Sequence, residues 1–244
     1  MTSNSTGKIT VINRMHPDEW PGDQVDEMFS RLHIPGVQFV TRDVPEAHMR
    51  SRGIEPGINT VRCFPGRPDG NRDEQWAWQV TEFCRDSALV LDIHGVRRGR
   101  GRSYPFTSAE SWSSPLVRGV ASLVGSTWVQ FIPAPHPVTV LPNCVGADLA
   151  LSTSFLDELP GLLRQLSQGW VPPTRTMKAY RITGGVKASE AKAVGLKRRY
   201  EQLERLPDEA ARRLGLPVPA HAIGWDADTL EPLTGYWGDV MTTA

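Results

Sequence analysis

The sequence predicts an α/β protein followed by a small second domain. In the first half of the chain, apolar strand-like segments alternate with amphipathic helix-like segments, which is typical of a sheet covered by helices. A length of 244 residues suffices for one large domain and an appendage. The proline-rich segment WVPPTRT separates the two parts, so we predict domains at residues 1–170 and 171–244.

The first elements alternate between strand and helix. KITVINRM, residues 8–15, predicts a strand because β-branched residues lead into a stretch of Pro, Asp and Gly. GDQVDEMFSRLHI, residues 22–34, repeats apolar side chains at the spacing of an amphipathic helix. VQFV, residues 37–40, is the second predicted strand.

A second helix and a third strand continue this alternation. NRDEQWAWQVTEFCRD, residues 71–86, predicts a helix with Asn71 as its N-cap. The predicted apolar face of this helix comprises Trp76, Val80 and Phe83. SALVLDIH, residues 87–94, is nearly all apolar, which predicts a central strand covered on both faces.

The rest of the chain also divides into strand-like and helix-like segments. We predict strands at 128–135 and 139–144 and helical structure at 154–169. In the C-terminal domain we predict β-like segments at 178–186 and 232–242 and a helix at 190–206. The appendage is therefore predicted to be β-rich with a helical insertion.

The composition argues against several classes of protein. The 27 basic and 27 acidic side chains balance, so no overall field favours nucleic acid or a membrane surface. The three cysteines show no C-x-x-C spacing, which argues against a disulfide framework and a thiolate metal site. The N-terminus lacks the apolar core of a signal peptide, and no apolar run approaches the roughly 18 residues of a membrane helix. We expect a cytoplasmic protein, either a monomer or a homo-oligomer.

Three candidate metal ligands follow predicted strands. His16 and Glu19 lie just past the first strand, and His94 ends the third. In α/β sheets the carboxyl ends of the strands line a common crevice, where these side chains can converge. Two imidazoles and one carboxylate, with a fourth position for water, are a recurring ligand set of catalytic zinc. A histidine at a strand end is also commonly a hydrogen-bonded structural residue, and spacing alone leaves this alternative open.

Three motifs together resemble one known family. HPDE at 16–19, RGIEPGIN at 52–59 with RCFPG after it, and LDIHG at 91–95 occur in this order. They are similar to His-Gly-(Asn/Asp)-Glu, Arg-x-Ile-Asp-x-Asp-Leu-Asn-Arg with Phe-Pro-Gly, and Asp-Leu-His of the succinylglutamate desuccinylase and aspartoacylase family. The resemblance covers roughly residues 8–170 and implies a zinc-carboxypeptidase-like mixed sheet flanked by helices.

The resemblance also implies roles for individual residues. It implies one Zn²⁺ per chain, held by His16, Glu19 and His94. Arg52 matches an arginine that polarises the scissile carbonyl, and Asn59 matches an asparagine that helps to bind the substrate carboxylate. The next family residue, an arginine, is Thr60 here; a two-residue insertion brings Arg62 into that role, and its guanidinium fork suits a carboxylate. Asp92 would orient a ligand from outside the site, or else satisfy backbone donors at the strand end.

The general base is the weakest match to the family. A zinc hydrolase needs a carboxylate that takes a proton from water and later delivers it to the leaving amine. The family has a glutamate on a late strand, and the nearest match in VGADLALS is the shorter Asp148. Three alternatives follow: Asp148 acts from a shifted backbone, another acid such as Glu110 serves, or the protein hydrolyses nothing.

A basic, glycine-rich loop directly follows His94. It contains Arg97, Arg98, Arg100 and Arg102. We predict that Arg97 and Arg98 help to bind an anionic substrate, while a solvated loop is the alternative. Binding of RNA is disfavoured because no aromatic residues are interleaved with the arginines.

These observations predict a zinc-dependent amidohydrolase. It would cleave an amide bond in a small, carboxylate-bearing substrate similar to an N-acyl amino acid, using metal-activated water. One alternative is a carboxypeptidase-like enzyme that acts on a short peptide or a peptide-like metabolite. The other is a catalytically degenerate binding protein that keeps the metal, which the missing glutamate motivates.

Overall fold

The computed structural model describes residues 7–49, 51–95, 103–124, 128–131, 145–181, 185–186, 193, 205–216, 218–220, 233–234 and 240–243. The chain divides into two compact units. The first comprises Met1–Val129 and Ala134–Met177, and the second comprises Gln130–Pro133 and Lys178–Ala244. The domain boundary at residue 170 stays a prediction.

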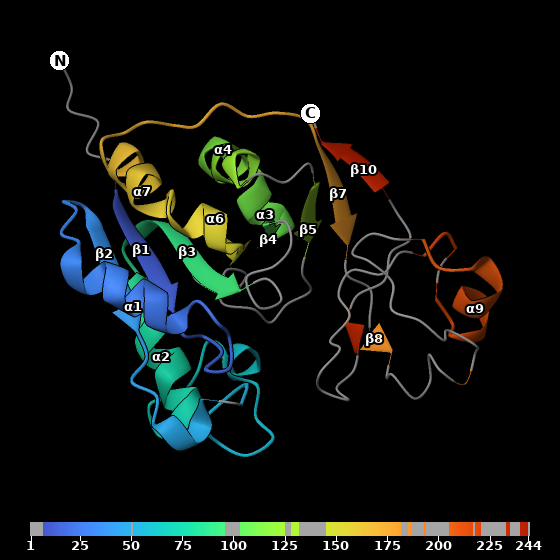
Figure 1. The fold of residues 1–244 in the computed structure, drawn as a ribbon, viewed down its shortest axis with the longest axis horizontal. Coiled ribbons are helices and arrows are strands. Elements are labelled where there is room, and N and C mark those ends of the chain that lie inside the picture. Colours follow the sequence, from blue (N-terminus) through green and yellow to red (C-terminus); the bar gives the residue numbers. More distant parts are fainter. Residues whose placement is uncertain are drawn as a thin grey trace. The chain divides into compact units, whose positions relative to one another are not determined.

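A mixed sheet forms the centre of the first unit. Its strands are β1 (Lys8–Asn13), β2 (Val37–Thr41), β3 (Ser87–Gly95), β4 (Tyr104–Thr107), β5 (Trp128–Phe131) and β6 (Val145–Leu151). They lie in the order β5-β4-β6-β3-β1-β2, and Figure 1 shows β3, β1 and β2 side by side. β1 pairs in parallel with β2 and β3, β3 pairs in parallel with β6, and β4 is antiparallel to β6. The predicted α/β class with a mixed sheet is confirmed.

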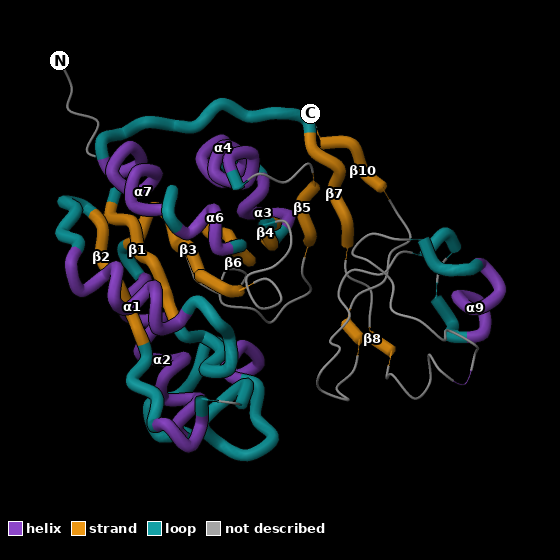
Figure 2. Tube along the Cα trace, viewed as in Figure 1, coloured by secondary structure: helices purple, strands orange, loops and turns teal. Residues whose placement is uncertain are grey.

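Helices flank this sheet. They are α1 (Gly22–Arg31), α2 (Arg72–Cys84), α3 (Ala109–Trp112), α4 (Pro115–Leu123), α6 (Thr153–Leu156) and α7 (Leu159–Ser167), with the 3-10 turns η1 (Glu46–His48) and η2 (Thr60–Cys63). Figure 2 shows that much of the chain between β2 and α2 is loop. This connection carries three of the predicted site residues, Arg52, Asn59 and Arg62.

α1 and α2 cover opposite faces of the sheet. Phe29 of α1 stacks on Phe39 of β2, with ring centroids 3.9 Å apart. Val40, the next residue of β2, packs instead against the cluster that α2 forms with Ile12 and Val90. Because neighbouring side chains of a strand point to opposite faces, the two helices lie on different sides of the sheet. β3 is accordingly buried at most of its positions, as its apolar sequence predicts.

The start of α2 is predicted correctly, and its buried face is predicted correctly except for Phe83. Asn71 caps the helix by accepting hydrogen bonds from the N–H groups of Asp73 and Glu74. The carboxylate of Glu74 accepts in return from the Asn71 N–H, which completes a capping box. Phe83 is 42% exposed, so its predicted place on the apolar face is wrong. Val80 is buried and Trp76 packs against the core cluster, as predicted, and Asp73, Ala77 and Cys84 complete the buried stripe.

Most other predicted elements of the first unit are confirmed. β1, β2, β3, β5 and α1 overlap the predicted segments, and α6 and α7 overlap the predicted helical region 154–169. β4, β6, α3 and α4 are additional to the predicted elements. The predicted strand at 139–144 lies outside the described residues, and residues 170–176 form neither helix nor strand.

The second unit contains short described elements. These are β7 (Met177–Arg181), β8 (Gly185–Val186), α9 (Asp208–Arg213), β9 (Leu233–Thr234) and β10 (Val240–Thr243). β8 pairs antiparallel with β9, β7 lies next to β10, and α9 buries Ala210 and Ala211. Most of the predicted helix at 190–206 lies outside the described residues, so the helical insertion stays a prediction.

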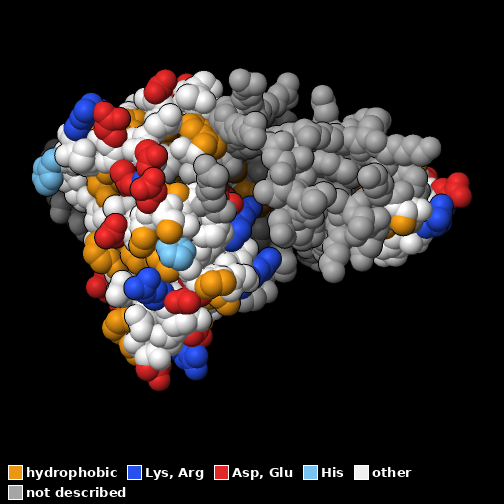
Figure 3. Space-filling model, turned by 60° about the horizontal axis from the view of Figure 1, so that its bottom comes forward, with side chains coloured by type: hydrophobic (Ala, Val, Ile, Leu, Met, Phe, Trp, Pro, Cys, Tyr) orange, Lys and Arg blue, Asp and Glu red, His pale blue; other side chains and the backbone are white. Residues whose placement is uncertain are grey.

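The described surface carries charges of both signs. On the face drawn in Figure 3, acidic and basic side chains are interspersed, and hydrophobic side chains reach the surface between them. Within the described ranges, no helix combines the length and apolar character needed to span a bilayer.

Candidate metal centre

A tight turn after β1 directs the chain toward the end of β3. Arg14, directly after the strand, has a φ of 61°, in the left-handed region that non-glycine residues rarely adopt. Its guanidinium is held by Asp26, at 2.5 Å, and by Asp23, both on α1. Because β1 and β3 are parallel neighbours, this turn brings the residues that follow to the carboxyl end of β3.

Gly95 lets the loop after β1 lie close to the end of β3. A Cβ atom at this position would lie 2.4 Å from the ring of Trp20. The Gly95 N–H donates to Glu19 Oε2 at 3.0 Å. A larger residue at 95 would therefore push away the loop that carries Glu19.

The three predicted ligands converge on the carboxylate of Glu19. Its Oε1 lies 2.9 Å from His16 Nδ1, and its Oε2 lies 3.0 Å from His94 Nδ1. One ligand atom from each of the three residues lies within 4.8 Å of the others. Two imidazole nitrogens and a carboxylate form a donor set that suits zinc and several other divalent ions. The structure brings together the three residues that the sequence predicts as ligands. Their role as ligands stays a prediction.

The outer nitrogen of each histidine faces an oxygen acceptor. His16 Nε2 lies 3.0 Å from Asn59 Oδ1, and His94 Nε2 lies 3.3 Å from Asp92 Oδ2. Metal-binding histidines commonly donate their second N–H to such an oxygen, which fixes the tautomer and the ring orientation. Both Nδ1 atoms are thereby left facing Glu19. The outer position of Asp92 matches the ligand-orienting role considered for it, whereas Asn59, predicted to bind substrate, contacts His16.

Arg52 places a positive charge between two of the candidate ligand atoms. Its Nη1 lies 2.8 Å from His16 Nδ1 and 2.7 Å from Glu19 Oε1. Arginine only donates hydrogen bonds, so His16 Nδ1 accepts and the ring proton lies on Nε2, toward Asn59. A cationic group thus already contacts both atoms, which supports the fit of this donor set to a metal ion.

Charges within the cluster shift the pKa values of its members. Burial opposes ionisation of Glu19, but His94 and His16 hold the pKa of its carboxyl well below the usual value. Burial also opposes the charged form of His94, but Asp92 and Glu19 raise its pKa well above the usual value. Burial and Arg52 lower the pKa of His16. The two histidines therefore differ in basicity although both face the same carboxylate.

Asp148, the predicted general base, lies on the outer side of His94. It pairs in register with Asp92 across β3 and β6, and its Oδ2 lies 3.7 Å from His94 Nε2. Asp92, His94 and Asp148 form a second, fully buried group with ligand atoms close together. Burial, followed by the charge of Asp92, raises the pKa of Asp148 well above the usual value. Asp148 is therefore placed next to the nitrogen that faces away from Glu19.

The remaining predicted residues come from other parts of the chain. Arg62 is exposed at the last turn of η2, and Glu110 is exposed on α3. The arginine loop, with Arg97 and Arg98, lies outside the described residues. The substrate-binding roles of Arg62, Arg97 and Arg98 stay predictions.

Asp18 is a neighbour of the site that the sequence analysis does not single out. Its carboxylate lies 3.7 Å from Arg52 Nε. Burial raises the pKa of Asp18, although Arg52 acts in the opposite direction. Its position between the two candidate ligands in HPDE is the only sequence signal that points to it.

Solved structures of known proteins share this architecture. The chain matches the succinylglutamate desuccinylase from Chromobacterium violaceum with a TM-score of 0.61 and 15% identity, covering 88% of this chain and 81% of that one. The chain has the fold of the succinylglutamate desuccinylases and aspartoacylases. The same fold occurs in a succinylglutamate desuccinylase/aspartoacylase from Rhodobacter sphaeroides, with a TM-score of 0.57, 14% identity, and coverage of 97% and 79%. It also occurs in murine aminoacylase 3, with a TM-score of 0.54, 12% identity, and coverage of 76% and 74%. No family model and no curated protein matches the sequence.

Proposed function

We propose that the protein is a metal-dependent hydrolase that cleaves an amide bond in a small, carboxylate-bearing substrate similar to an N-acyl amino acid. The observation that carries this proposal is the convergence of His16, Glu19 and His94 at the carboxyl ends of two parallel strands. Both histidines have an outer oxygen partner, Asn59 or Asp92, which is the arrangement expected of metal ligands. Zinc is the proposed ion, one per chain.

The residues of the centre would divide the chemical work. Zinc, when bound, lowers the pKa of a coordinated water to about 7 and polarises a carbonyl oxygen. Arg52, half exposed beside Glu19, would donate hydrogen bonds to the carbonyl oxygen of the substrate as it gains negative charge. Arg62 would bind the substrate carboxylate with its guanidinium fork. Asp148 would accept the proton of the water and pass it to the leaving amine, a role that requires it to move from the outer side of His94, where its Oδ2 lies 3.7 Å from Nε2.

The fold supports this class of substrate. The matched structures are named as desuccinylases and an aminoacylase, names that describe removal of an acyl group from an amino acid. Because the basic and acidic residues balance, an anionic substrate would be recognised by local groups. The four arginines after His94 and Arg62 are the proposed groups.

A second function, binding without hydrolysis, is favoured by the place of Asp148. Its Oδ2 lies 3.7 Å from the outer nitrogen of His94, on the side of the ring that faces away from Glu19. Replacing Asp148 with Asn and with Glu separates the two functions. A hydrolase loses activity in Asp148→Asn while it keeps its metal, whereas a binding protein shows no turnover in the wild type on a broad panel.

Metal content comes first in the test of the proposal. We expect about one zinc per chain by mass spectrometry in protein purified without chelator, and loss of this zinc in His94→Ala. The zinc-loaded protein is then tested on N-acyl amino acids and on dipeptides with a free C-terminus. Preference for the N-acyl amino acids supports the proposal, preference for dipeptides indicates the carboxypeptidase-like alternative, and no metal after reconstitution with zinc contradicts both.

A further inference from the structure

The loop from Arg52 to Thr60 is folded around a carboxylate that comes from another element. Asp73, in the first turn of α2, is fully buried, and its Oδ2 accepts a hydrogen bond from the Glu55 N–H at 2.8 Å. Its Oδ1 accepts from the Ile54 N–H at 3.2 Å and from Thr60 Oγ1 at 2.5 Å. Successive backbone N–H groups that face one anion form a small anion-binding concavity, and here Asp73 fills it.

Gly53 and Arg42 make this burial feasible. A Cβ atom at position 53 would lie 2.9 and 3.0 Å from the two oxygens of Asp73, so only glycine leaves room for the carboxylate. Arg42, directly after β2 and 4% exposed, donates to Asp73 Oδ1 at 2.8 Å and to Thr60 Oγ1 at 2.9 Å. Removing one partner of a buried pair of carboxylate and guanidinium strongly destabilises the folded protein, because the other charge is left buried without compensation. The cluster of Arg42, Thr60 and Asp73, which we call the loop anchor, therefore fixes the loop conformation.

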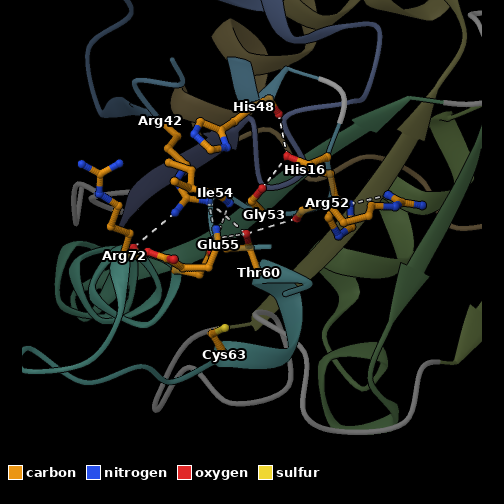
Figure 4. Close-up of polar contacts among 12 residues, drawn as sticks. His16, Arg42, His48, Arg52, Gly53, Ile54, Glu55, Thr60, Cys63 and Arg72 are labelled. Carbon is orange, nitrogen blue, oxygen red and sulfur yellow. Dashed lines mark hydrogen bonds and ion pairs between the residues drawn. The ribbon is translucent and has the colours of Figure 1, made fainter. Parts of the chain in front are cut away.

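Arg52 and Asn59, which contact His16 of the metal centre, lie at the two ends of the anchored loop. Thr60 N–H donates to the carbonyl oxygen of Arg52 at 3.3 Å, which closes the loop next to the anchor. Asn59, just before Thr60, caps η2 by accepting from the Val61 N–H at 3.2 Å with the same Oδ1 that faces His16 Nε2. Figure 4 shows Gly53, Ile54, Glu55 and Thr60 gathered at the anchor, with Arg42 and Arg72 on one side and Arg52 and His16 on the other.

We infer that Asp73 is a positioning residue of the metal centre, which sets the contact of Asn59 with His16 through the loop anchor. The carboxylate fixes Ile54, Glu55 and Thr60, and these fix the residues at both ends of the loop. Loss of the anchor would release both ends of the loop, so that Asn59 would leave His16 Nε2 and Arg52 would leave His16 Nδ1. The His16 ring would then no longer be held in one tautomer. His94 Nε2 faces Asp92 Oδ2 of its own strand at 3.3 Å, and loss of the loop anchor would leave this contact unchanged. The effect on metal affinity rests on the proposed function, whereas the effect on the His16 ring does not.

Two variants remove the anchor to different degrees. Asp73→Ala removes the carboxylate, and Thr60→Val removes one donor while keeping the shape of the side chain. Glu74→Gln is the matched control, because this neighbouring carboxylate contacts Arg67 and the Asn71 N–H instead of the loop. Thr60→Ser, which keeps the hydroxyl, tests for rescue. Circular dichroism establishes that each variant is folded, and Thr60→Val decides if Asp73→Ala does not fold.

The first readout is the ¹⁵N spectrum of the two imidazole rings in metal-free protein. We expect His16 to show the Nε2–H tautomer in the wild type, Glu74→Gln and Thr60→Ser, and a mixture in Asp73→Ala and Thr60→Val. The signals of His94 should stay unchanged in all of them. An unchanged His16 in a folded anchor variant overturns the inference, as does an equal change at both histidines.

The second readout is zinc affinity by competition with a chelator. We expect the anchor variants to bind zinc about tenfold more weakly, as for loss of an outer partner of a ligand. Because the anchor acts through Asn59, Asp73→Ala should weaken binding little further in an Asn59→Ala background. Full additivity of the two changes contradicts the inference. A wild type that binds no zinc contradicts the proposed function, and the imidazole spectra then decide the inference alone.

Discussion

His16 and His94 occupy matching places in the candidate metal centre, but the chain holds them by different means. The outer nitrogen of His94 faces Asp92, two residues earlier on β3, so one strand supplies both the ligand and its support. The outer nitrogen of His16 faces Asn59, which reaches it from a loop that depends on Asp73 of α2. One half of the centre is thus local, and the other half is assembled from three separate parts of the chain. The local half should resist distant substitutions, and the assembled half should not.

The largest effect is expected where the two halves meet. Glu19 contacts both histidines, so Glu19→Gln removes the charge that unites them. We expect zinc affinity to fall by more than the roughly 10–100-fold typical of an outer partner, since a ligand itself is lost. Chelator competition measures the change, and Glu27→Gln on the exposed side of α1 is the control. A loss smaller than that caused by Asp92→Asn would show that Glu19 does not bind the metal.

The next effect compares the two outer partners directly. Asp92→Asn removes a charged acceptor from His94, and Asn59→Ala removes a neutral one from His16. Asp92 brings a negative charge to within 3.3 Å of His94 Nε2, whereas Asn59 offers a neutral oxygen to His16 Nε2. We therefore expect Asp92→Asn to weaken zinc binding by about 10–100-fold and Asn59→Ala to weaken it less. A greater loss in Asn59→Ala, measured by the same competition, would reverse this ranking of the two halves.

A smaller effect concerns the stability of the assembled half. Gly53→Ala forces a Cβ atom against Ile58 O, at 2.7 Å, and against the carboxylate of Asp73. We expect a loss of about 1–3 kcal/mol in the free energy of unfolding, as for overpacking elsewhere. Urea denaturation measures it, with Gly161→Ala as the control, because a Cβ atom there meets no atom within 4 Å. Equal stability of Gly53→Ala and Gly161→Ala would mean that the loop adapts without the anchor.

The smallest expected effect is the pH dependence of the stability that Asp73 contributes. Burial opposes ionisation of Asp73, but hydrogen bonds from Thr60, the Glu55 N–H and Arg42 hold its pKa below the usual value. Its stabilisation is therefore fully present above the unfolded pKa of about 3.9 and is lost as the pH falls toward the lower folded value. The difference in unfolding free energy between wild type and Asp73→Asn should be larger at pH 6 than at pH 3. A difference independent of pH would contradict this expectation.

The local half of the centre is also the half that sequence predicts best. The apolar run SALVLDIH predicts β3 as a buried strand that ends in His94, and the period of two in a strand places Asp92 on the side of His94. The strand at 8–15 likewise predicts that His16 and Glu19 follow a carboxyl end. These inferences need only short-range patterns and the rule that parallel strands share an edge.

The assembled half depends on contacts that no short pattern encodes. Arg42, Thr60 and Asp73 come from three elements, and only the folded loop brings them together. The sequence does not distinguish a buried arginine after an edge strand, such as Arg42, from an exposed one. The family resemblance implies that Asn59 binds substrate. Spacing alone cannot reveal that the side-chain oxygen of Asn59 faces His16. The wrong prediction for Phe83 has a similar cause, because the loop and the sheet that pack against α2 determine which of its residues are buried.

Arg52 has a consequence for how the protein matures. Its guanidinium already lies against His16 Nδ1 and Glu19 Oε1, so the chain itself supplies a cation beside this carboxylate. Loading with the proposed metal would then exchange one cation for another, and folding would not depend on the ion. Arg52, displaced by the ion, would stay beside the centre and could contact the substrate.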